Sequence, residues 1–304
     1  MPLATTILQS SLLATPFNTF TLNYIMVNYK LFFIIPTVLL VFSIAVLANG
    51  YLTTGEWFKK SIELKGGDLI TVFPDKPASV ASVQNAFAKF SGVAVREIGG
   101  VAGQGIEIYG IGNETVVSGE FESLGIGISS ISVRTISPAL GEMFWSQTQL
   151  AIIIAFIFMG AVVFIIFRTV VPSFAVILCA FSDIVTALAF MQIFGVEMSL
   201  ASLAALLMLI GYSVDTDIVQ TSKTLKSGVV FAESYRTAFK TGITMTGTTL
   251  AALAVLYVLS ISPVISQIAA VLLIGLCADM PYTWIQNSTI LKWQIDRKNA
   301  GEAK

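Results

Sequence analysis

The chain has 304 residues, of which 55% are hydrophobic and only 12% charged, and its mean hydropathy is +0.84. Soluble domains carry about 25% charged residues, so this composition is that of an integral membrane protein. A net charge of −1 and the lack of a basic run exclude a nucleic-acid-binding protein. Histidine is absent, which removes the commonest metal ligand and general base. The two cysteines, Cys179 and Cys277, lie in apolar segments and are interpreted as small packing residues.

Residues 1–27 contain no basic residue, unlike the start of a signal peptide. They allow two interpretations: a weakly ordered tail, or a true start at Met26, just before the first apolar segment. The first membrane helix is predicted within residues 28–50, which are apolar and long enough to span a bilayer.

Residues 51–146 differ from the rest, because they hold seven of the 17 Lys and Arg and ten of the 18 Asp and Glu. Segments 68–73, 93–98 and 105–111 have the alternation or the β-rich composition of strands. Residues 77–90 begin with proline and place apolar side chains on one helical face. We therefore predict a water-facing α+β domain with a ferredoxin-like fold.

Residues 147–290 are predicted to form a bundle of five further membrane helices, followed by a cytoplasmic tail, 291–304. The fold class is thus an α-helical membrane protein with six transmembrane helices and one external α+β domain between the first and the second. The six apolar segments are 31–50, 147–167, 171–194, 198–222, 241–259 and 264–290.

The basic residues predict the orientation of the chain in the membrane. Connections near 194–198 and 260–264 contain no Lys or Arg, so their side is predicted to be extracytoplasmic, together with residues 51–146. Both termini are then cytoplasmic. That side receives Lys30, Arg168, Lys223, Lys226, Arg236, Lys240, Lys292, Arg297, Lys298 and Lys304.

The fourth apolar segment carries two aspartates, Asp215 and Asp217. A carboxylate in hydrocarbon costs at least a few kcal/mol, so such residues usually have a function or a partner. Two positions apart on a helix, they point in nearly opposite directions and cannot share a proton. Asp217 lies on a polar stripe that runs from Ser213 to Thr224, whereas Asp215 has more apolar neighbours. We expect Asp215 to be the drier carboxyl and the first candidate for binding and releasing a proton.

Two more acids lie within predicted membrane helices: Asp183 near the centre of the third and Asp279 near the centre of the sixth. Four carboxyl groups in one small bundle favour an ionisable interior used for proton or ion coupling. A structural role for each of them, in pairing with a lysine or in capping a broken helix, is the alternative.

The fifth apolar segment follows Lys240. The lysine side chain can extend to water at the membrane surface or reach toward Asp217, and both possibilities are open. Small residues allow membrane helices to approach closely, and threonines hydrogen-bond to backbone carbonyls or between helices. On this ground we expect helix packing to involve Gly211, Gly242, Gly247, Thr248 and Thr249.

No nucleophile elbow, phosphate-binding loop or metal-ligand spacing occurs, so no enzymatic activity, cofactor or metal site is predicted. Over residues 28–295 the chain resembles the SecD/SecF protein-export family of the resistance-nodulation-division superfamily, in its archaeal SecF form. The motifs that carry the resemblance are LKGGDLI (64–70), ISPALGE (136–142), SDIVTAL (182–188), IGYSVDTDIV (210–219) and MTGTTL (245–250).

The chain departs from the bacterial pattern of this family at two places. That pattern reads GYSV-Asn-Asp-Thr, so the family's proton-linked aspartate falls on Thr216, with Asp215 and Asp217 on either side. The arginine of the fifth span in bacterial relatives falls on Thr241, with Lys240 immediately before it. The acid–base pair is either preserved with shifted residues or replaced by another coupling arrangement.

The resemblance implies a non-enzymatic, multi-pass cell-membrane subunit that acts with SecD beside the SecYE channel. It also implies that the outer domain engages the translocating polypeptide while the helices, surrounded by membrane lipid, couple this cycle to proton movement. Asp215 ranks first among the coupling residues, then Asp217 with Lys240, with Asp183 and Asp279 in support. The alternatives are a half-size exporter of small molecules or lipids from the same superfamily, and a membrane scaffold.

Overall fold

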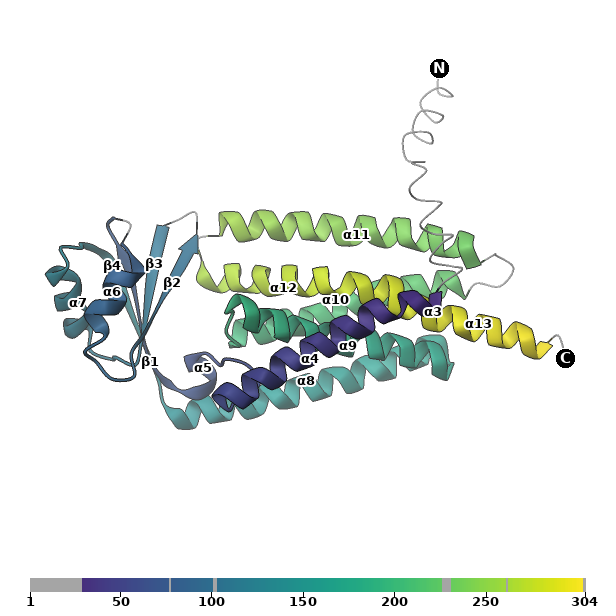
Figure 1. Cartoon of the computed structure of the whole chain (residues 1–304), viewed down its shortest axis with the longest axis horizontal. Helices are drawn as coiled ribbons and strands as arrows, with labels where there is room; N and C mark the ends of the chain where they lie inside the picture. The colour runs from purple at the N-terminus through teal and green to yellow at the C-terminus, as the bar shows by residue number, and fades with distance from the viewer. Residues whose placement is uncertain (1–28, 77, 101–102, 226–230, 261, 303–304) are drawn as a thin grey trace, which may run out of the picture.

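The computed structural model describes residues 29–302 except 77, 101–102, 226–230 and 261. The predicted tail and the alternative start at Met26 lie outside these residues. Within them, six helices are long and apolar enough to cross a membrane, as predicted. Figure 1 shows these helices side by side, with a small sheet domain at one end.

The first five spans are single helices, and the sixth is composite. The short helices α3 (Tyr29–Phe32) and α5 (Ile62–Lys65) flank the first span. The sixth span contains a π-helical segment, η1, between two α-helices. The bounds are α4 (Ile34–Thr54), α8 (Pro138–Phe167), α9 (Val170–Phe194), α10 (Leu200–Thr224), α11 (Phe231–Leu259), and then α12 (Pro263–Pro281), η1 (Tyr282–Asn287) and α13 (Ser288–Glu302).

Several helices extend beyond the apolar segments that predicted them. The helix α8 begins at Pro138 rather than at 147, and α11 begins at Phe231 rather than at 241. At the start of α8 the Ser137 hydroxyl accepts a hydrogen bond from the backbone N–H of Leu140, and proline is the first helical residue. Hydropathy detects only the apolar part of a helix, whereas helical hydrogen bonding can continue into the less apolar residues beside it.

The sheet domain has the element order β-α-β-β-α-β. Its four strands are antiparallel in the order β2-β3-β1-β4, which is the ferredoxin-like arrangement and confirms the predicted fold class. The bounds are β1 (Gly67–Pro74), α6 (Val80–Phe87), β2 (Ala94–Gly100), β3 (Gly103–Tyr109), α7 (Glu114–Ser123) and β4 (Ile128–Ile136).

The two faces of the sheet differ because side chains alternate along each strand. One face buries Ile70, Val72, Ile106 and Ile108 against α6 and α7, and this layer is the core of the domain. The other face carries polar residues and lines a cleft of about 630 Å³ that the bundle closes with the ends of α9 to α12 on the same side. The sheet domain therefore rests on the membrane bundle through its polar face.

The chain enters and leaves the sheet domain at one point. A Cβ atom on Gly66 would lie 2.7 Å from Cα of Pro138, and one on Gly141 would lie 2.5 Å from the backbone nitrogen of Gly66. Gly66 also has a φ of +77°, which favours glycine. These residues form the stem of the domain, where two chain segments are in backbone contact.

Within the bundle, α9 and α10 are the interior helices. In α9, 61% of the most apolar window is buried within the chain, against 11% in α8 and in α11. The helix α12 packs against α9, α10 and α11. A polar site inside the bundle must therefore be built mainly from α9, α10 and α12.

Candidate functional site

Three carboxyl groups from three helices meet inside the bundle: Asp183 of α9, Asp217 of α10 and Asp279 of α12. We call them the carboxylate cluster. None of the three side chains is more than 1% exposed. The Ser213 hydroxyl donates a hydrogen bond to Oδ2 of Asp183 over 2.5 Å, and the side chains of Asp183 and Asp279 interact directly.

The segment η1 supplies the polar partners of the other two carboxyl groups. Thr283 donates a hydrogen bond to Oδ1 of Asp279 over 3.0 Å, and the Asn287 amide donates one to Oδ1 of Asp217 over 3.0 Å. The same amide lies 3.2 Å from the hydroxyl of Thr221. The cluster is thus held between α10 and the π-helical part of the sixth span.

The π-helical geometry places these partners on the inner side. Pro281 precedes η1 and has no backbone N–H to donate, so regular α-helical bonding is interrupted there. Single π-helical turns occur frequently at functional sites because they shift the side chains that follow. In η1 the shifted residues include Thr283, Gln286 and Asn287, which are all at most 2% exposed.

The cluster has no cationic partner among the described residues. Their ion pairs are Lys60–Glu56, Lys89–Glu120, Arg96–Glu197 and Lys292–Asp296, all away from it. Oδ1 of Asp183, Oδ2 of Asp217 and Oδ1 of Asn287 are buried without a hydrogen-bond partner. An isolated buried carboxylate is costly, so three of them so close together favour bound protons.

The structure reverses the predicted environments of the two aspartates of α10. Asp217 is 0% exposed, whereas Asp215 is exposed on the outer side of the bundle. The predicted polar stripe is confirmed as one face of α10, because Ser213, Gln220 and Thr221 are buried on the same side as Asp217. The expectation that Asp215 is the drier carboxyl group was wrong, because the polar face of a membrane helix turns toward the protein interior.

Of the two orientations left open for Lys240, the one that reaches toward Asp217 is not found. Lys240 is exposed on α11 and has no ion pair with a described residue. Instead, Lys223 at the end of α10 donates a hydrogen bond to the Thr241 hydroxyl over 2.7 Å. The lysine that joins α10 to α11 is therefore Lys223.

Only part of the predicted packing set lies at close helix contacts. A Cβ atom on Gly242 would lie 2.2 Å from the ring of Trp284, so this glycine lets α11 approach η1. Gly211 and Gly247 face open space. Thr248 and Thr249 donate hydrogen bonds to carbonyls of their own helix.

A second polar network joins the sheet domain to the bundle. It surrounds residues 195–200, here called the junction loop, which comprise the connection between α9 and α10 and the first residue of α10. The Arg96 side chain of β2 donates a hydrogen bond to the backbone oxygen of Gly195 and pairs with Glu197 over 3.3 Å. The Tyr109 hydroxyl of β3 lies 3.3 Å from the same carboxylate.

Backbone contacts strengthen this attachment. The N–H of Ser61 donates to the carbonyl oxygen of Met198, and the N–H of Met198 donates to that of Lys59, both over 2.8 Å. The Glu63 carboxylate accepts a hydrogen bond from the N–H of Leu200 over 2.9 Å. The junction loop is therefore bonded both to the strands of the sheet domain and to residues 59–63, which precede that domain.

The junction also holds two carboxylates close together outside the membrane spans. The Tyr109 hydroxyl donates to Glu107 over 2.8 Å and lies near Glu197 as well. Burial raises the pKa of Glu107, and the negative charge of Glu197 raises it further, although the bond from Tyr109 acts in the opposite direction. Burial and the two carboxylates also raise the pKa of Tyr109, which stays a hydrogen-bond donor.

Comparison with known proteins identifies the family. The family model "Protein export membrane protein SecD/SecF, C-terminal" matches residues 116–297. The protein-export membrane protein SecF of Pyrococcus furiosus is 39% identical over 90% of this chain and 93% of its own length. The chain belongs to the SecD/SecF protein-export family. The SecF proteins of Methanolacinia petrolearia and Methanothermobacter thermautotrophicus are 38% and 36% identical over 86% and 90% of this chain, and over 93% and 96% of their own lengths.

A solved structure has the same fold. The crystal structure of SecDF, a translocon-associated membrane protein from Thermus thermophilus, matches with a TM-score of 0.69 over 88% of this chain, at 17% identity. This chain spans 38% of the length of that protein. The curated archaeal relatives and the six spans together identify a multi-pass protein-export membrane subunit of the SecF type.

Sequence reasoning found the three carboxyl groups of this SecF-type chain but missed what surrounds them. Thr283 and Asn287 follow Pro281 in the sixth span, and a proline followed by polar residues in an apolar run is a signal for an interrupted helix. Arg96 and Glu197 are 101 positions apart, and no local pattern connects them. Their contact is visible only in the fold.

Proposed function

We propose that this SecF-type subunit acts with SecD beside the Sec channel and couples proton movement at the carboxylate cluster to movement of its sheet domain. The observation that carries the proposal is the burial of Asp183, Asp217 and Asp279 together without a described cation. The sheet domain is attached to the loop that connects two of the helices involved.

The chemistry of the cluster supports proton exchange. A protonated carboxyl can donate a hydrogen bond to a neighbouring carboxylate, whereas two neighbouring ionised groups repel each other. Asp183 and Asp279 are close enough to interact directly, so proton loss there favours separation of α9 from α12. Binding or release of a proton can thereby select between two packing arrangements of the helices.

The junction loop offers a route by which such a change reaches the sheet domain. Asp183 precedes the loop by 12 residues in α9, about 18 Å of helix, and Asp217 follows it by 17 residues in α10, about 25 Å. Helices transmit small shifts along their axes. A shift of α9 relative to α10 would therefore move the loop to which Arg96 and Tyr109 are bonded.

The exposed side of the bundle supports a membrane partner. The second half of α11, from Ala251 to Leu259, exposes nearly every side chain, and Asp215 is exposed on α10. A carboxyl group facing lipid is costly, so a partner helix is expected to cover Asp215. SecD is the proposed partner, because the solved SecDF relative is more than twice as long as this chain.

The basic residues support the proposed orientation. Short connections near the sheet domain, 194–198 and 260–264, contain no Lys or Arg, and the opposite ends of the helices carry many. Both termini are then cytoplasmic, and the sheet domain is extracytoplasmic. In this orientation the cleft between the sheet and the bundle faces the side on which a translocating polypeptide emerges.

Asparagine variants test which carboxyl group couples. Asp217→Asn and Asp183→Asn are expected to abolish the stimulation of export of a secreted reporter, while co-purification with SecD and folding are retained. Asp215→Asn is the matched control on the outer face of the same helix and should affect assembly more than coupling. Normal stimulation by both cluster variants would reject the proposal.

Infrared difference spectroscopy between acidic and alkaline pH tests the proton itself. The carbonyl band of a protonated carboxyl group is expected in the wild type and should lose intensity in Asp183→Asn, Asp217→Asn or Asp279→Asn. An unchanged band in all three variants would assign proton binding elsewhere.

Co-purification of SecD and channel subunits separates the export role from a small-molecule exporter, which would be recovered without the channel.

A further inference from the structure

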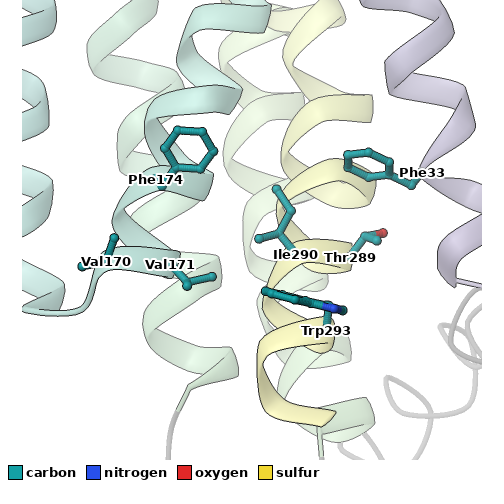
Figure 2. Close-up of a pocket in the computed structure, with 7 residues that line it drawn as sticks. All are labelled: Phe33, Val170, Val171, Phe174, Thr289, Ile290 and Trp293. Carbon is teal, nitrogen blue, oxygen red and sulfur yellow. The ribbon is translucent and has the colours of Figure 1, made fainter. Parts of the chain in front are cut away.

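An apolar groove lies at the end of the bundle opposite the sheet domain. Figure 2 shows its two walls, formed by the start of α9 and by α13, with the beginning of the first span beside them. The cavity has a volume of about 490 Å³. Its lining is almost entirely apolar and consists of Phe33, Val170, Val171, Phe174, Thr289, Ile290 and Trp293.

The groove extends from the hydrocarbon layer to the headgroup level. Trp293 lies 30 residues after Pro263 in the sixth span, about 45 Å along the helix, whereas the hydrocarbon layer is only about 30 Å thick. Tryptophan is also enriched at membrane–water boundaries, where its ring contacts both environments. Phe174 lies a turn further into the bundle than Val170, so the opposite end of the groove reaches acyl chains.

Two arginines adjoin residues that line the groove. Arg168, an exposed residue two positions before Val170, has a left-handed backbone (φ 52°) in the turn between α8 and α9. The Arg297 guanidinium lies 5.4 Å from the centre of the Trp293 ring. The neighbouring acidic residue, Asp296, is paired with Lys292 over 3.4 Å.

We propose that the groove is a specific binding site for one anionic phospholipid. An acyl chain lies along the apolar walls, and the phosphate group binds between Arg168 and Arg297. Basic pockets between membrane helices bind anionic headgroups in this way, and guanidinium groups match phosphate oxygens in pairs. A volume of about 490 Å³ is large enough for a single lipid chain, and the two arginines supply positive charge for its phosphate, which favours a lipid as the occupant.

The test uses the full chain in lipid nanodiscs and the fluorescence of Trp293. Phosphatidylglycerol with brominated acyl chains quenches nearby tryptophans, and it is titrated into unlabelled phosphatidylcholine. The contribution of Trp293 is the difference between the wild type and Trp293→Phe. Quenching of this contribution should saturate at a low mole fraction of the anionic lipid, whereas brominated phosphatidylcholine should quench only in proportion to its amount.

Matched variants separate a site from ordinary lipid contact. Two arginine contacts predict a preference for the anionic lipid of roughly 30-fold. The double variant Arg168→Gln/Arg297→Gln should abolish this preference, whereas Arg236→Gln, an exposed basic residue on α11, should retain it. Val171→Phe, which narrows the groove, should weaken quenching by the anionic lipid while thermal unfolding stays unchanged.

Two results would overturn the proposal. Equal quenching of the Trp293 contribution by anionic and zwitterionic brominated lipids in the wild type would mean that only bulk lipid contacts the groove. Loss of quenching by the anionic lipid when SecD is reconstituted with the chain would mean that a partner helix occupies it. Because neither readout involves export or protons, failure here is distinguishable from failure of the proposed coupling role.

Discussion

Asn287 donates a hydrogen bond over 3.0 Å to Asp217 and thereby connects the π-helical part of the sixth span to α10. Both side chains are 0% exposed. The bond satisfies one oxygen of Asp217 and leaves the other, Oδ2, without a partner. One oxygen of this carboxyl group is thus fixed by the protein, and the other is available to a proton.

The first prediction concerns this bond. Asn287→Ala removes the donor from a buried carboxyl group, which is expected to lower the free energy of unfolding by about 1–3 kcal/mol. Thermal unfolding of the purified chain in detergent micelles measures the effect. Asn49→Ala, at an exposed position of α4, is the control and should be nearly neutral. Equal melting temperatures for the two variants would contradict the structural role of Asn287.

The second prediction concerns two glycines of α11. In Gly242→Ala the new Cβ atom would lie 2.2 Å from the buried ring of Trp284, so α11 or the ring must move. Overpacking of this kind costs about 1–3 kcal/mol. In Gly247→Ala the Cβ atom meets open space, and the higher helix propensity of alanine should stabilise the chain by up to about 1 kcal/mol. Thermal unfolding should therefore give shifts of opposite sign, and two equal shifts would exclude the close contact.

The third prediction concerns the junction loop. Arg96→Ala removes the side-chain contacts to Gly195 and Glu197. Because Arg96 is partly exposed, we expect the free energy of local opening at the junction loop to fall by only about 1 kcal/mol. This corresponds to roughly fivefold faster hydrogen exchange. Hydrogen exchange followed by mass spectrometry should show this increase in peptides that cover residues 195–200.

Arg134→Ala is the matched control for this experiment. Arg134 lines the same cleft from β4 but is exposed and makes no ion pair with a described residue. Its loss should leave exchange in the junction loop unchanged. If both variants accelerated exchange equally, the attachment would depend on the total charge of the cleft rather than on the Arg96 contacts.

The fourth prediction concerns pH. The pKa of Glu107 is raised above its ordinary value of 4.5, mainly by burial. The folded chain therefore binds this proton more tightly than the unfolded chain does. As pH rises from 4.5 through the raised pKa, the contribution of Glu107 to the free energy of unfolding falls. Glu107→Gln removes that dependence.

Melting temperatures at pH 4 and pH 8 measure this effect. The difference between Glu107→Gln and the wild type should be more favourable to the variant at pH 8, where the wild-type carboxylate is ionised and close to Glu197. Glu122→Gln, at an exposed position of α7, controls for the loss of a negative charge in the same domain. An advantage in melting temperature of Glu107→Gln over the wild type that was larger at pH 4 than at pH 8 would contradict a raised pKa of Glu107.

The fold was predictable because its signals are local. Six apolar segments gave the six spans, and the alternation in 105–111 together with the apolar helical face in 77–90 indicated the ferredoxin-like domain. Helix ends were less predictable: α8 begins at Pro138, before the apolar run that hydropathy detects.

The site was predictable in its carboxyl groups but not in their surroundings. Opposite faces for Asp215 and Asp217 follow from helix geometry, but which face is buried depends on how α10 packs against α9 and α12. The sequence left open whether Lys240 reaches Asp217 or extends to water, because its depth in the membrane does not fix the direction of its side chain. The π-helical turn at Tyr282–Asn287 depends on hydrogen-bonding geometry that hydropathy does not record.

The stem at Gly66 has a consequence for the modular construction of this chain. Because the segments entering and leaving the sheet domain touch at Gly66 and Pro138, the membrane bundle is continuous in space without the domain. A domain whose ends lie together can be excised or exchanged at little cost to its host. Residues 67–136 could therefore be exchanged for a related domain of different size without changing the six spans, provided that the new domain replaces the contacts of Arg96 and Tyr109 with the junction loop.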